Sequence, residues 1–515
     1  MPLFLVSDEP VHRDPTPRPL TTTTLPGTPA RLQVSDAQGV LATLTEGAKT
    51  VPVRGPERTF TEQKKPFVDE FDRTTTGGWG TSRGGGTWSN ANGVDADYSV
   101  SGGAGVISMT ADNSSRYTSL VNDITDLDAR LSWSLNVMPA GNASSLALSF
   151  AYTSTTSHYR ARLSVLTTGT VQLILECQTP SGTTTLGALT TVGTGYVVGD
   201  VWHIRAQRTG TTLRCRAWKD GTTEPSTWVH NVVDATLGAG RIGVRGLAST
   251  GSTALPFTFR IHDIQLYSGL WPAPPVVTHD TWVRVLPTPF DGTWTPALAD
   301  QIRAWAVDRT PDVLAYAMGY ITGAPTVTAP ALAGAPIMGQ SHYGPMDVDG
   351  TLIEGADFHD YMGLDWTFPN GEVLAAKPSE LGSLDCSGFV RMIYGYHMGI
   401  PMVRTQNIDG TNLPRITKDI GPSGPGVIVA QATDTAPPLT AIQIGDVPHF
   451  DATTETTIGE LDHNGIYLGV DSNGRPRFIN SRKTPDGPTF GDLGGASALD
   501  GTGLYATSLR LIRRF

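Results

Sequence analysis

The sequence predicts a multidomain chain in which a large all-β sandwich is followed by a smaller α+β domain. With 515 residues the chain is too long for one ordinary domain. Its 58 Gly and 37 Pro favour turns and short strands, and 39% hydrophobic residues are enough for packed cores. Period-two alternation dominates before residue 270, whereas the clear helix signals come after it.

Charge and composition exclude several classes of partner. The formal net charge is -11, and no segment supplies the clustered Lys and Arg that nucleic acid requires. No run of about 18 apolar residues exists, so we expect no membrane span. The first residues lack the charged and apolar regions of a signal peptide. Three cysteines are too few for a disulfide framework.

Residues 1–66 are rich in Thr and Pro and contain short alternating runs at 32–34 and 50–53. This composition predicts an extended N-terminal arm with a small β module that docks on a partner. A poorly ordered linker is the alternative interpretation.

Residues 67–269 show repeated alternation, for example at Leu131, Trp133, Leu135 and Val137. Strands at turn-bounded spacing over about 200 residues predict one two-sheet antiparallel sandwich. Cys177 and Cys215 lie on the apolar faces of their strands, which favours buried thiols, with a disulfide between them as the alternative.

The opening 67–73 with Gly77-Gly78-Trp79 and the closing 259–267 resemble concanavalin-like or laminin-G-like jelly-roll domains. The resemblance implies a jelly-roll sandwich. Such folds often bind glycans, yet many are purely structural, so a glycan site on the sandwich stays open and no residues are assigned to it.

Residues 270–339 read as a linker and helical connector. Pro272 to Pro275 forms a rigid start. Thr295-Pro296 and Thr310-Pro311 each place an N-cap residue before a Pro at the first helical position, and so predict two short helices. Residues 340–515 form the last domain.

Within this domain, the segment Leu384-Asp385-Cys386-Ser387-Gly388 opens an apolar stripe with helical spacing. Asp385 is then the N-cap, and Cys386 lies in the first turn. The free N–H groups and the dipole at a helix start stabilise a thiolate, the form that attacks a carbonyl. A small buried cysteine at a helix start is the alternative.

A histidine on a strand favours the catalytic interpretation. Ile466, Leu468 and Val470 alternate on one strand face, and His463 lies at the mouth of that strand. A cysteine at a helix start that faces a histidine on a sheet is the arrangement of papain-like peptidases, in which the imidazole accepts the thiol proton.

Three motifs, 385–390, 444–450 and 463–469, occur in the order seen in the NlpC-type cell-wall cysteine peptidases, which they resemble. The resemblance covers about residues 381–515. It implies a papain-like α+β fold and hydrolysis of amide bonds in peptidoglycan stems without a metal or other cofactor. It also implies that Asp385 and Ser387 lie at the amine-bearing end of the substrate, although Asp385 could serve only as a helix cap.

The third polar residue of the resemblance falls on Asn480, 17 residues after His463. A tight turn at Asn473-Gly474 would place Asn480 opposite Tyr467, about 13 Å along the strand from His463. The assignment therefore requires a wide or bulged loop, which Pro476 favours. His397 and His449 are interpreted as structural, because neither stands at metal-ligand spacing.

The layout resembles the minor tail proteins of bacteriophages, which implies a virion location, bacterial peptidoglycan as substrate and other tail proteins as partners of the arm. Two other hypotheses stay open: a structural or adhesion protein with an inactive peptidase domain, and an amidase or acyltransferase on the same fold. The sequence leaves the oligomeric state open, a homo-oligomer included.

Overall fold

The computed structural model describes residues 4–6, 19–62, 67–82, 86–120, 124–268, 274–347, 351–404, 408, 410–452 and 460–515. Two compact units are present. One holds Lys65–Trp271 with Met346–Leu352, and the other holds Met1–Lys64, Pro272–Pro345 and Ile353–Phe515. We call them the sandwich and the discontinuous unit.

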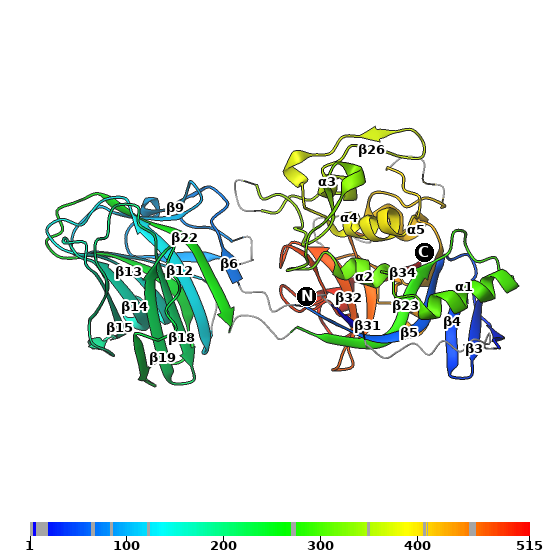
Figure 1. Cartoon of the computed structure of the whole chain (residues 1–515), viewed down its shortest axis with the longest axis horizontal. Helices are drawn as coiled ribbons and strands as arrows, with labels where there is room; N and C mark the ends of the chain where they lie inside the picture. The colour runs from blue at the N-terminus through cyan, green and yellow to red at the C-terminus, as the bar shows by residue number, and fades with distance from the viewer. Residues whose placement is uncertain are drawn as a thin grey trace. The chain divides into compact units, whose positions relative to one another are not determined.

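The sandwich consists of two antiparallel sheets (Figure 1). The first sheet runs β20 (His230–Val233), β19 (Thr212–Lys219), β18 (Trp202–Thr209), β12 (Leu127–Leu135), β22 (Phe257–Ser268), β10 (Gly105–Met109), β9 (Tyr98–Val100) and β7 (Thr75–Thr76), with β6 (Phe67–Asp69) paired to β22. The second runs β16 (Gly182–Thr185), β15 (Val171–Thr179), β14 (Ser157–Val165), β13 (Ser144–Ser154), β21 (Arg241–Ala248), β11 (Ser114–Leu120) and β8 (Trp88–Ala91), with β17 (Thr190–Gly193) paired to β15.

Alternation along the strands builds the core between these sheets. Leu131, Trp133 and Leu135 are buried in it, as the pattern predicts. Val137 is not, because β12 ends at Leu135 and leaves Val137 exposed. Cys177 and Cys215 are buried free thiols within the same core, so the disulfide alternative does not hold.

The discontinuous unit contains three larger sheets. The first runs β1 (Phe4–Val6), β5 (Thr50–Thr61), β4 (Gly39–Thr45), β3 (Arg31–Asp36) and β2 (Thr21–Leu25), with β23 (Val276–Val285) paired to β5. The second runs β28 (Val427–Gln431), β34 (Leu509–Arg514), β29 (Val447–Phe450) and β30 (His463–Asn464). The third runs β31 (Ile466–Val470), β32 (Pro476–Arg482) and β33 (Gly487–Thr489).

Short elements complete this unit. Two small ribbons pair β24 (Val327–Ala329) with β25 (Ala335–Met338) and β26 (Trp366–Thr367) with β27 (Val373–Leu374). The helices are α1 (Pro296–Val307), α2 (Val313–Met318), α3 (Phe358–Met362), α4 (Cys386–Val390), α5 (Thr417–Ser423) and α6 (Leu504–Ser508), and α4 continues into a π-helical segment, Arg391–His397.

The sandwich is inserted at the end of a strand pair of the discontinuous unit. β5 and β23 are antiparallel neighbours, with Val276 opposite Thr61 and Val285 opposite Thr50. In Figure 1 the blue β5 and the green β23 lie side by side. The two chain segments that lead to and from the sandwich therefore start from adjacent positions.

The N-terminal β module belongs to the discontinuous unit. The sequence instead predicts that residues 1–66 form a separate docking arm. Phe60 lies in one apolar cluster with Val277 of β23 and Phe389 of α4. The carbonyl of Phe515 accepts hydrogen bonds from the N–H groups of Lys49 and Thr50. The Thr- and Pro-rich composition, most marked from Pro15 to Pro29, suggests an extended arm although Thr21–Leu25 forms β2. Strand pairing over more than 200 positions leaves no local signal of the true partner.

One predicted helix start is correct and one is shifted. Thr295 caps α1 and accepts a hydrogen bond from the Leu298 N–H, with Pro296 as the first helical residue. The second helix begins at Val313 and is capped by Asp312, not by Thr310. The Asp312 carboxylate accepts from the Ala315 N–H and also forms a buried ion pair with Arg58 of β5, so tertiary contact fixes the start.

Candidate active site

Cys386 is the first residue of α4. Asp385 is the N-cap, and its Oδ1 accepts from the Gly388 N–H at 2.7 Å. The apolar stripe predicted from the sequence is fully buried, with Phe389, Val390 and Ile393 at 0% exposure. These side chains pack in the core of the unit and hold the helix in place. The Cys386 N–H, at the helix start, has no intrahelical acceptor.

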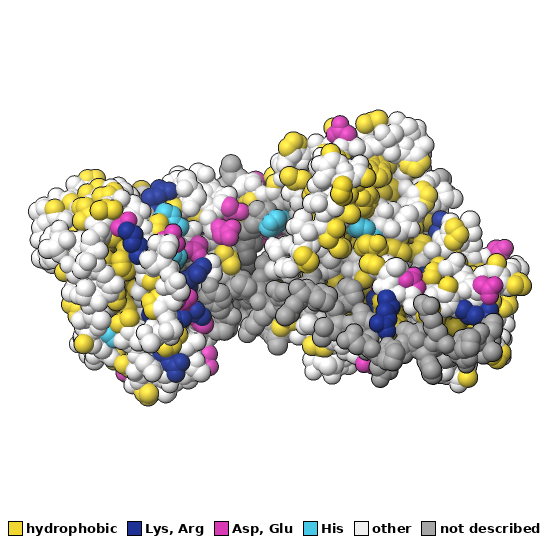
Figure 2. All heavy atoms as spheres, in the orientation of Figure 1, with side chains coloured by type: hydrophobic (Ala, Val, Ile, Leu, Met, Phe, Trp, Pro, Cys, Tyr) yellow, Lys and Arg dark blue, Asp and Glu magenta, His cyan; other side chains and the backbone are white. Residues whose placement is uncertain are grey.

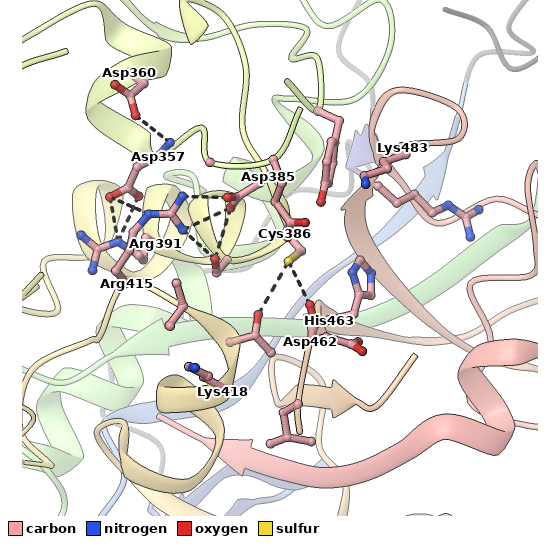
Figure 3. A pocket seen from close by; sticks show the side chains of 18 of the residues that line it. Asp357, Asp360, Asp385, Cys386, Arg391, Arg415, Lys418, Asp462, His463 and Lys483 are labelled. Atoms are coloured by element: carbon pink, nitrogen blue, oxygen red, sulfur yellow. Dashed lines mark hydrogen bonds and ion pairs between the residues drawn. The ribbon is translucent and has the colours of Figure 1, made fainter. Parts of the chain in front are cut away.

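His463 opens β30, which pairs with β29 through Phe450 opposite His463. Its ring stacks on Tyr505 at 5.1 Å and lies 6.0 Å from the Phe450 ring. Figure 3 shows the imidazole and the Cys386 sulfur on the same side of one pocket, which both residues line.

Asn480 fixes the orientation and the tautomer of His463. The carbonyl oxygen of its amide lies 2.9 Å from His463 Nε2, and its amide nitrogen donates to Thr489 O (3.1 Å) and Ser497 Oγ (3.0 Å). A backbone carbonyl only accepts, so the amide nitrogen must face Thr489 and the oxygen must face the imidazole. Nε2 therefore carries a proton, and in the neutral ring Nδ1 is the free base.

The hairpin between His463 and Asn480 is bulged, as the assignment of Asn480 requires, but it is not wide. Tyr467 pairs with Phe478 and Val470 with Pro476, with a register shift between Tyr467 and Gly469. The Asp471 N–H donates to the Arg475 carbonyl, and the Gly474 N–H donates to the Asp471 carbonyl, so the loop is residues 472–474 and the two-residue turn at Asn473-Gly474 is not formed. Asn480 consequently lies beyond the Ile466–Ile479 pair, at the His463 end of the strand.

The thiol makes two contacts in the pocket. Cys386 Sγ lies 3.6 Å from Thr417 Oγ1 and 3.7 Å from the Asp462 carbonyl oxygen, which can only accept. Burial, with the charges of Asp385 and Glu354, raises the pKa of the Cys386 thiol well above its ordinary value. Burial lowers the pKa of His463 to about 4, although the hydrogen bond to Asn480 opposes it. Thiol and imidazole are therefore both neutral at pH 7.

The two predicted substrate-binding residues line the pocket and are held by an arginine. Arg415 contacts both oxygens of Asp385, with Nη2–Oδ2 at 2.7 Å, and donates to Ser387 Oγ at 2.7 Å. Its Nε also lies 3.6 Å from Asp357, which pairs with the buried Arg391. This network was not predicted, because residues 401–416 carry no periodicity or motif that would indicate it.

The pocket has a volume of about 780 Å³, enough for several amino-acid residues. Tyr343 and Glu354 line it beside Asp385, and the Tyr343 hydroxyl is hydrogen-bonded with Glu354. Partial desolvation and the Asp385 carboxylate raise the pKa of Glu354. Two carboxyl groups, those of Glu354 and Asp385, therefore lie on the Cys386 side of a pocket that lysine and arginine side chains also line.

A residue of the N-terminal β module supports this site from behind. Glu62 accepts from the Phe490 N–H at 2.6 Å and from Thr489 Oγ1 at 3.0 Å. Thr489 is the residue opposite Asn480 in the β32–β33 pair and accepts from its amide. The module is therefore linked to the third residue of the site through one strand.

Among the described residues, the hydrogen bonds of Cys386 and Asn480 do not include His397 or His449, which have surroundings of their own. His397 stacks on Tyr316 at 4.0 Å and bonds the Tyr320 hydroxyl at 2.7 Å. His449 is fully buried, and neither ring nitrogen has a hydrogen-bond partner among the described residues. Burial, with the positive charge of Arg513, lowers the pKa of His449 to about 3.

We expect His449→Leu to flatten the loss of stability in acid. The folded pKa lies below the ordinary value, so this residue's contribution to stability is complete above about pH 6.5 and is lost as the pH falls toward 3. At pH 5 the cost of keeping the ring neutral is on the order of 2 kcal/mol. Urea unfolding at pH 7.5 and pH 5 measures it, and an equal fall in unfolding free energy for variant and wild type would contradict the prediction.

Asn480→Ala is expected to lower kcat by roughly one to three orders of magnitude, less than loss of Cys386 or His463, because the proton transfer remains available in poorer geometry. Initial rates on a soluble stem peptide measure it. Ser497→Ala is the matched control, since it removes one bond to the Asn480 amide and leaves the bond to His463. Equal rates for Asn480→Ala and wild type would remove Asn480 from the site.

Neither a metal nor a membrane span is indicated by the described part of the chain. It contains no group of three or more His, Cys, Asp or Glu that could hold a metal ion. None of its helices is long and apolar enough to cross a membrane.

Comparison with protein-family models gives no match, and comparison with curated proteins gives none either. Among solved structures the chain is similar to a carbohydrate-binding module from Bacillus subtilis, with 12% identity over 35% of this chain and 95% of that one, at a TM-score of 0.26. It is also similar to a beta-1,3-glucanase from Mycobacterium marinum (13% identity, 40% and 100% covered, TM-score 0.28) and a beta-glucanase from Bacillus licheniformis (13%, 40% and 100%, TM-score 0.29).

Proposed function

We propose that the discontinuous unit is a cysteine endopeptidase that cuts amide bonds in the stem peptides of bacterial peptidoglycan. The observation that carries the proposal is that one pocket is lined both by Cys386, at the start of α4, and by His463, whose Nε2 lies 2.9 Å from Asn480 Oδ1. That arrangement is the nucleophile, base and orienting amide of papain-like hydrolysis.

The reaction starts from a neutral pair. His463 Nδ1 accepts the thiol proton as Sγ attacks the substrate carbonyl carbon. The imidazolium therefore forms together with the new C–S bond, and no free thiolate accumulates. The Asn480 oxygen holds Nε2–H and stabilises the imidazolium. Because the folded pKa of His463 is about 4, the base stays available down to mildly acidic pH.

The backbone N–H of Cys386 donates to the oxyanion of the tetrahedral intermediate, since it has no intrahelical acceptor. Collapse of the intermediate breaks the C–N bond, and the imidazolium protonates the leaving amine. The resulting thioester on Cys386 is hydrolysed by a water molecule that His463 deprotonates, which releases the acid and restores the thiol.

The carboxyl groups of Glu354 and Asp385 favour a substrate that carries an amino group on the acyl side of the cut. Arg415 pairs with Asp385, so Glu354, which is hydrogen-bonded with Tyr343 and lies in the field of Lys483 and Arg415, supplies the remaining acceptor. Stem peptides that have been freed from the lactyl group have such an end. The motif order at 385–390, 444–450 and 463–469 is the reason for choosing peptidoglycan among peptide substrates.

The resemblance to minor tail proteins motivates a location on a bacteriophage tail, where the enzyme would open the host wall locally. The docking role then falls on the Pro-rich stretch 7–18, outside the described residues, because the β module from Thr21 onward is built into the discontinuous unit.

Soluble stem peptides of defined sequence, prepared with and without the lactyl group on the first residue, test the proposal. The full chain is expected to release fragments with a new amino terminus, with or without EDTA. An amidase would instead separate the lactyl group from the first residue, and an acyltransferase would join fragments. Cleavage that EDTA abolishes would contradict the thiol mechanism, and no cleavage of any stem peptide would favour a binding protein with an inactive site.

A further inference from the structure

Glu62 follows the last residue of β5, and its carboxylate contacts the end of β33. Oε1 accepts from the Phe490 N–H at 2.6 Å, and Oε2 accepts from the Thr489 hydroxyl at 3.0 Å. Both oxygens therefore act as acceptors, which is the pattern of an ionised carboxylate. The pairing of Thr61 with Val276 of β23 fixes the backbone from which this side chain reaches.

The carboxylate approaches the segment after β33 closely. A Cβ added at Gly491 would lie 2.9 Å from Glu62 Oε2, so a side chain at this position would displace the carboxylate. Figure 2 shows acidic side chains that stand on the surface of both units, as expected for a chain of net charge -11. Glu62 differs from these, because it is partly buried and directs both oxygens at donors of the protein.

One peptide group joins Glu62 to the amide of Asn480. The Thr489 carbonyl and the Phe490 N–H belong to this group, and in a trans peptide they point in opposite directions. The N–H end donates to Glu62, and the carbonyl end accepts from Asn480 Nδ2 at 3.1 Å. A negative charge at the N–H end makes the carbonyl oxygen a stronger acceptor, because hydrogen bonds in series polarise one another.

The same effect continues through Asn480 to His463. The Asn480 amide donates through Nδ2 and accepts through Oδ1, which lies 2.9 Å from His463 Nε2. A stronger bond at Nδ2 makes Oδ1 more negative, which favours the imidazolium that forms when Nδ1 takes the thiol proton. Asn480 is 0% and Thr489 2% exposed, so water does not screen this path.

We propose that Glu62 is a positioning residue of the catalytic site, whose negative charge strengthens the Asn480–His463 hydrogen bond through this one peptide group. The N-terminal β module thereby places a carboxylate behind the orienting amide, whereas Ser-His-Asp sites place one directly on the imidazole. The inference deepens the proposed function and rests on it, because it takes the thiol and the imidazole of the pocket as nucleophile and base. The alternative is that Glu62 only anchors β5 to β33.

Glu62→Gln separates these two roles, since the amide keeps the size of the side chain and can accept from the Phe490 N–H but carries no charge. We expect kcat on a soluble stem peptide to fall roughly three- to tenfold, because a charge-assisted hydrogen bond is about twice as strong as a neutral one. KM should stay within about twofold, since Glu62 does not touch the substrate. An anchor alone would leave kcat at the wild-type value.

Asp471→Asn is the matched control. Asp471 is also a carboxylate of this unit that holds a strand end, because it pairs with Arg477 at 2.7 Å and accepts from the Asn473 N–H. Its neutral variant should lose stability and keep kcat. The melting temperature of each variant is measured beside the rates.

The Asn480→Ala chain supplies a second readout. Because the effect of Glu62 runs through the Asn480 amide, adding Glu62→Gln to Asn480→Ala should change kcat by less than about twofold. Gly491→Ala approaches the question from the other side of the contact. It displaces the carboxylate without removing its charge, and it should lower kcat in the wild-type background at an unchanged KM.

Alkylation of Cys386 by iodoacetamide, followed by mass spectrometry of the peptide that contains it, reads the thiol and its base without a stem peptide. We expect Glu62→Gln to slow alkylation by about the same factor as kcat. Wild-type rates in both Glu62→Gln and Gly491→Ala, or an equal fall caused by Glu62→Gln with and without Asn480, would overturn the proposal. If no stem peptide were cleaved but Glu62→Gln still slowed alkylation, the proposed substrate would be rejected and the role of Glu62 would stand.

Discussion

Cys386→Ala is expected to abolish stem-peptide hydrolysis, by about 10⁶-fold in kcat, while the chain remains folded. The nucleophile and the base of a catalytic triad act together. In well-studied hydrolases, removal of the nucleophile alone therefore lowers kcat about as much as removal of all three triad residues. The side chain is only 2% exposed, and removing one sulfur leaves a small cavity. Rates on a soluble stem peptide and the melting temperature, measured together, check both parts.

Cys215→Ala is the matched control for this substitution. It removes a buried thiol of the sandwich core, also free, and should leave the rate unchanged with a comparable loss of stability. If Cys386→Ala kept more than about a thousandth of the wild-type rate, another nucleophile would have to be sought.

Deletion of residues 1–62 is expected to prevent the discontinuous unit from folding, with complete loss of activity. The deletion removes β5, the partner of β23, and Phe60 from the main apolar cluster. It also leaves the buried Asp312 without Arg58, and an unpaired buried charge costs roughly 3 to 5 kcal/mol. Circular dichroism and the soluble yield of the truncated chain measure this result. A soluble, active chain would contradict the fold described above.

The complementary deletion removes the sandwich. Thr61 and Val276 are opposite each other, so a short turn in place of residues 63–274 converts β5 and β23 into a hairpin. This variant should fold and cleave stem peptides at a rate near that of the full chain. Loss of cleavage in a chain that melts normally would mean that the sandwich contributes to catalysis.

The site residues that can be predicted from the sequence alone are those next to a periodic hydrophobic pattern. Asp385 and Cys386 precede a helical stripe, and His463 precedes an alternating strand, so periodicity places all three. Asn480 needed the family resemblance as well, since the bulge between Tyr467 and Gly469 decides its register and leaves no mark in the sequence.

The remaining parts depend on contacts between distant segments. Arg415 reaches Asp385 across 30 residues, and Glu62 reaches Phe490 across 428. Thr310 is a good cap by type, yet Asp312 replaces it because Arg58 lies opposite. Non-local pairing of this kind carries no periodic signal, and the N-terminal module was therefore expected to be separate.

Digestion of purified peptidoglycan by the full chain and by Cys386→Ala, in parallel and with mass spectrometry of the soluble products, tests the central claim most directly. We expect fragments of stem peptide with new amino termini from the wild-type chain and none from Cys386→Ala. Identical products from both proteins, or products with new reducing sugar ends and intact stems, would contradict it.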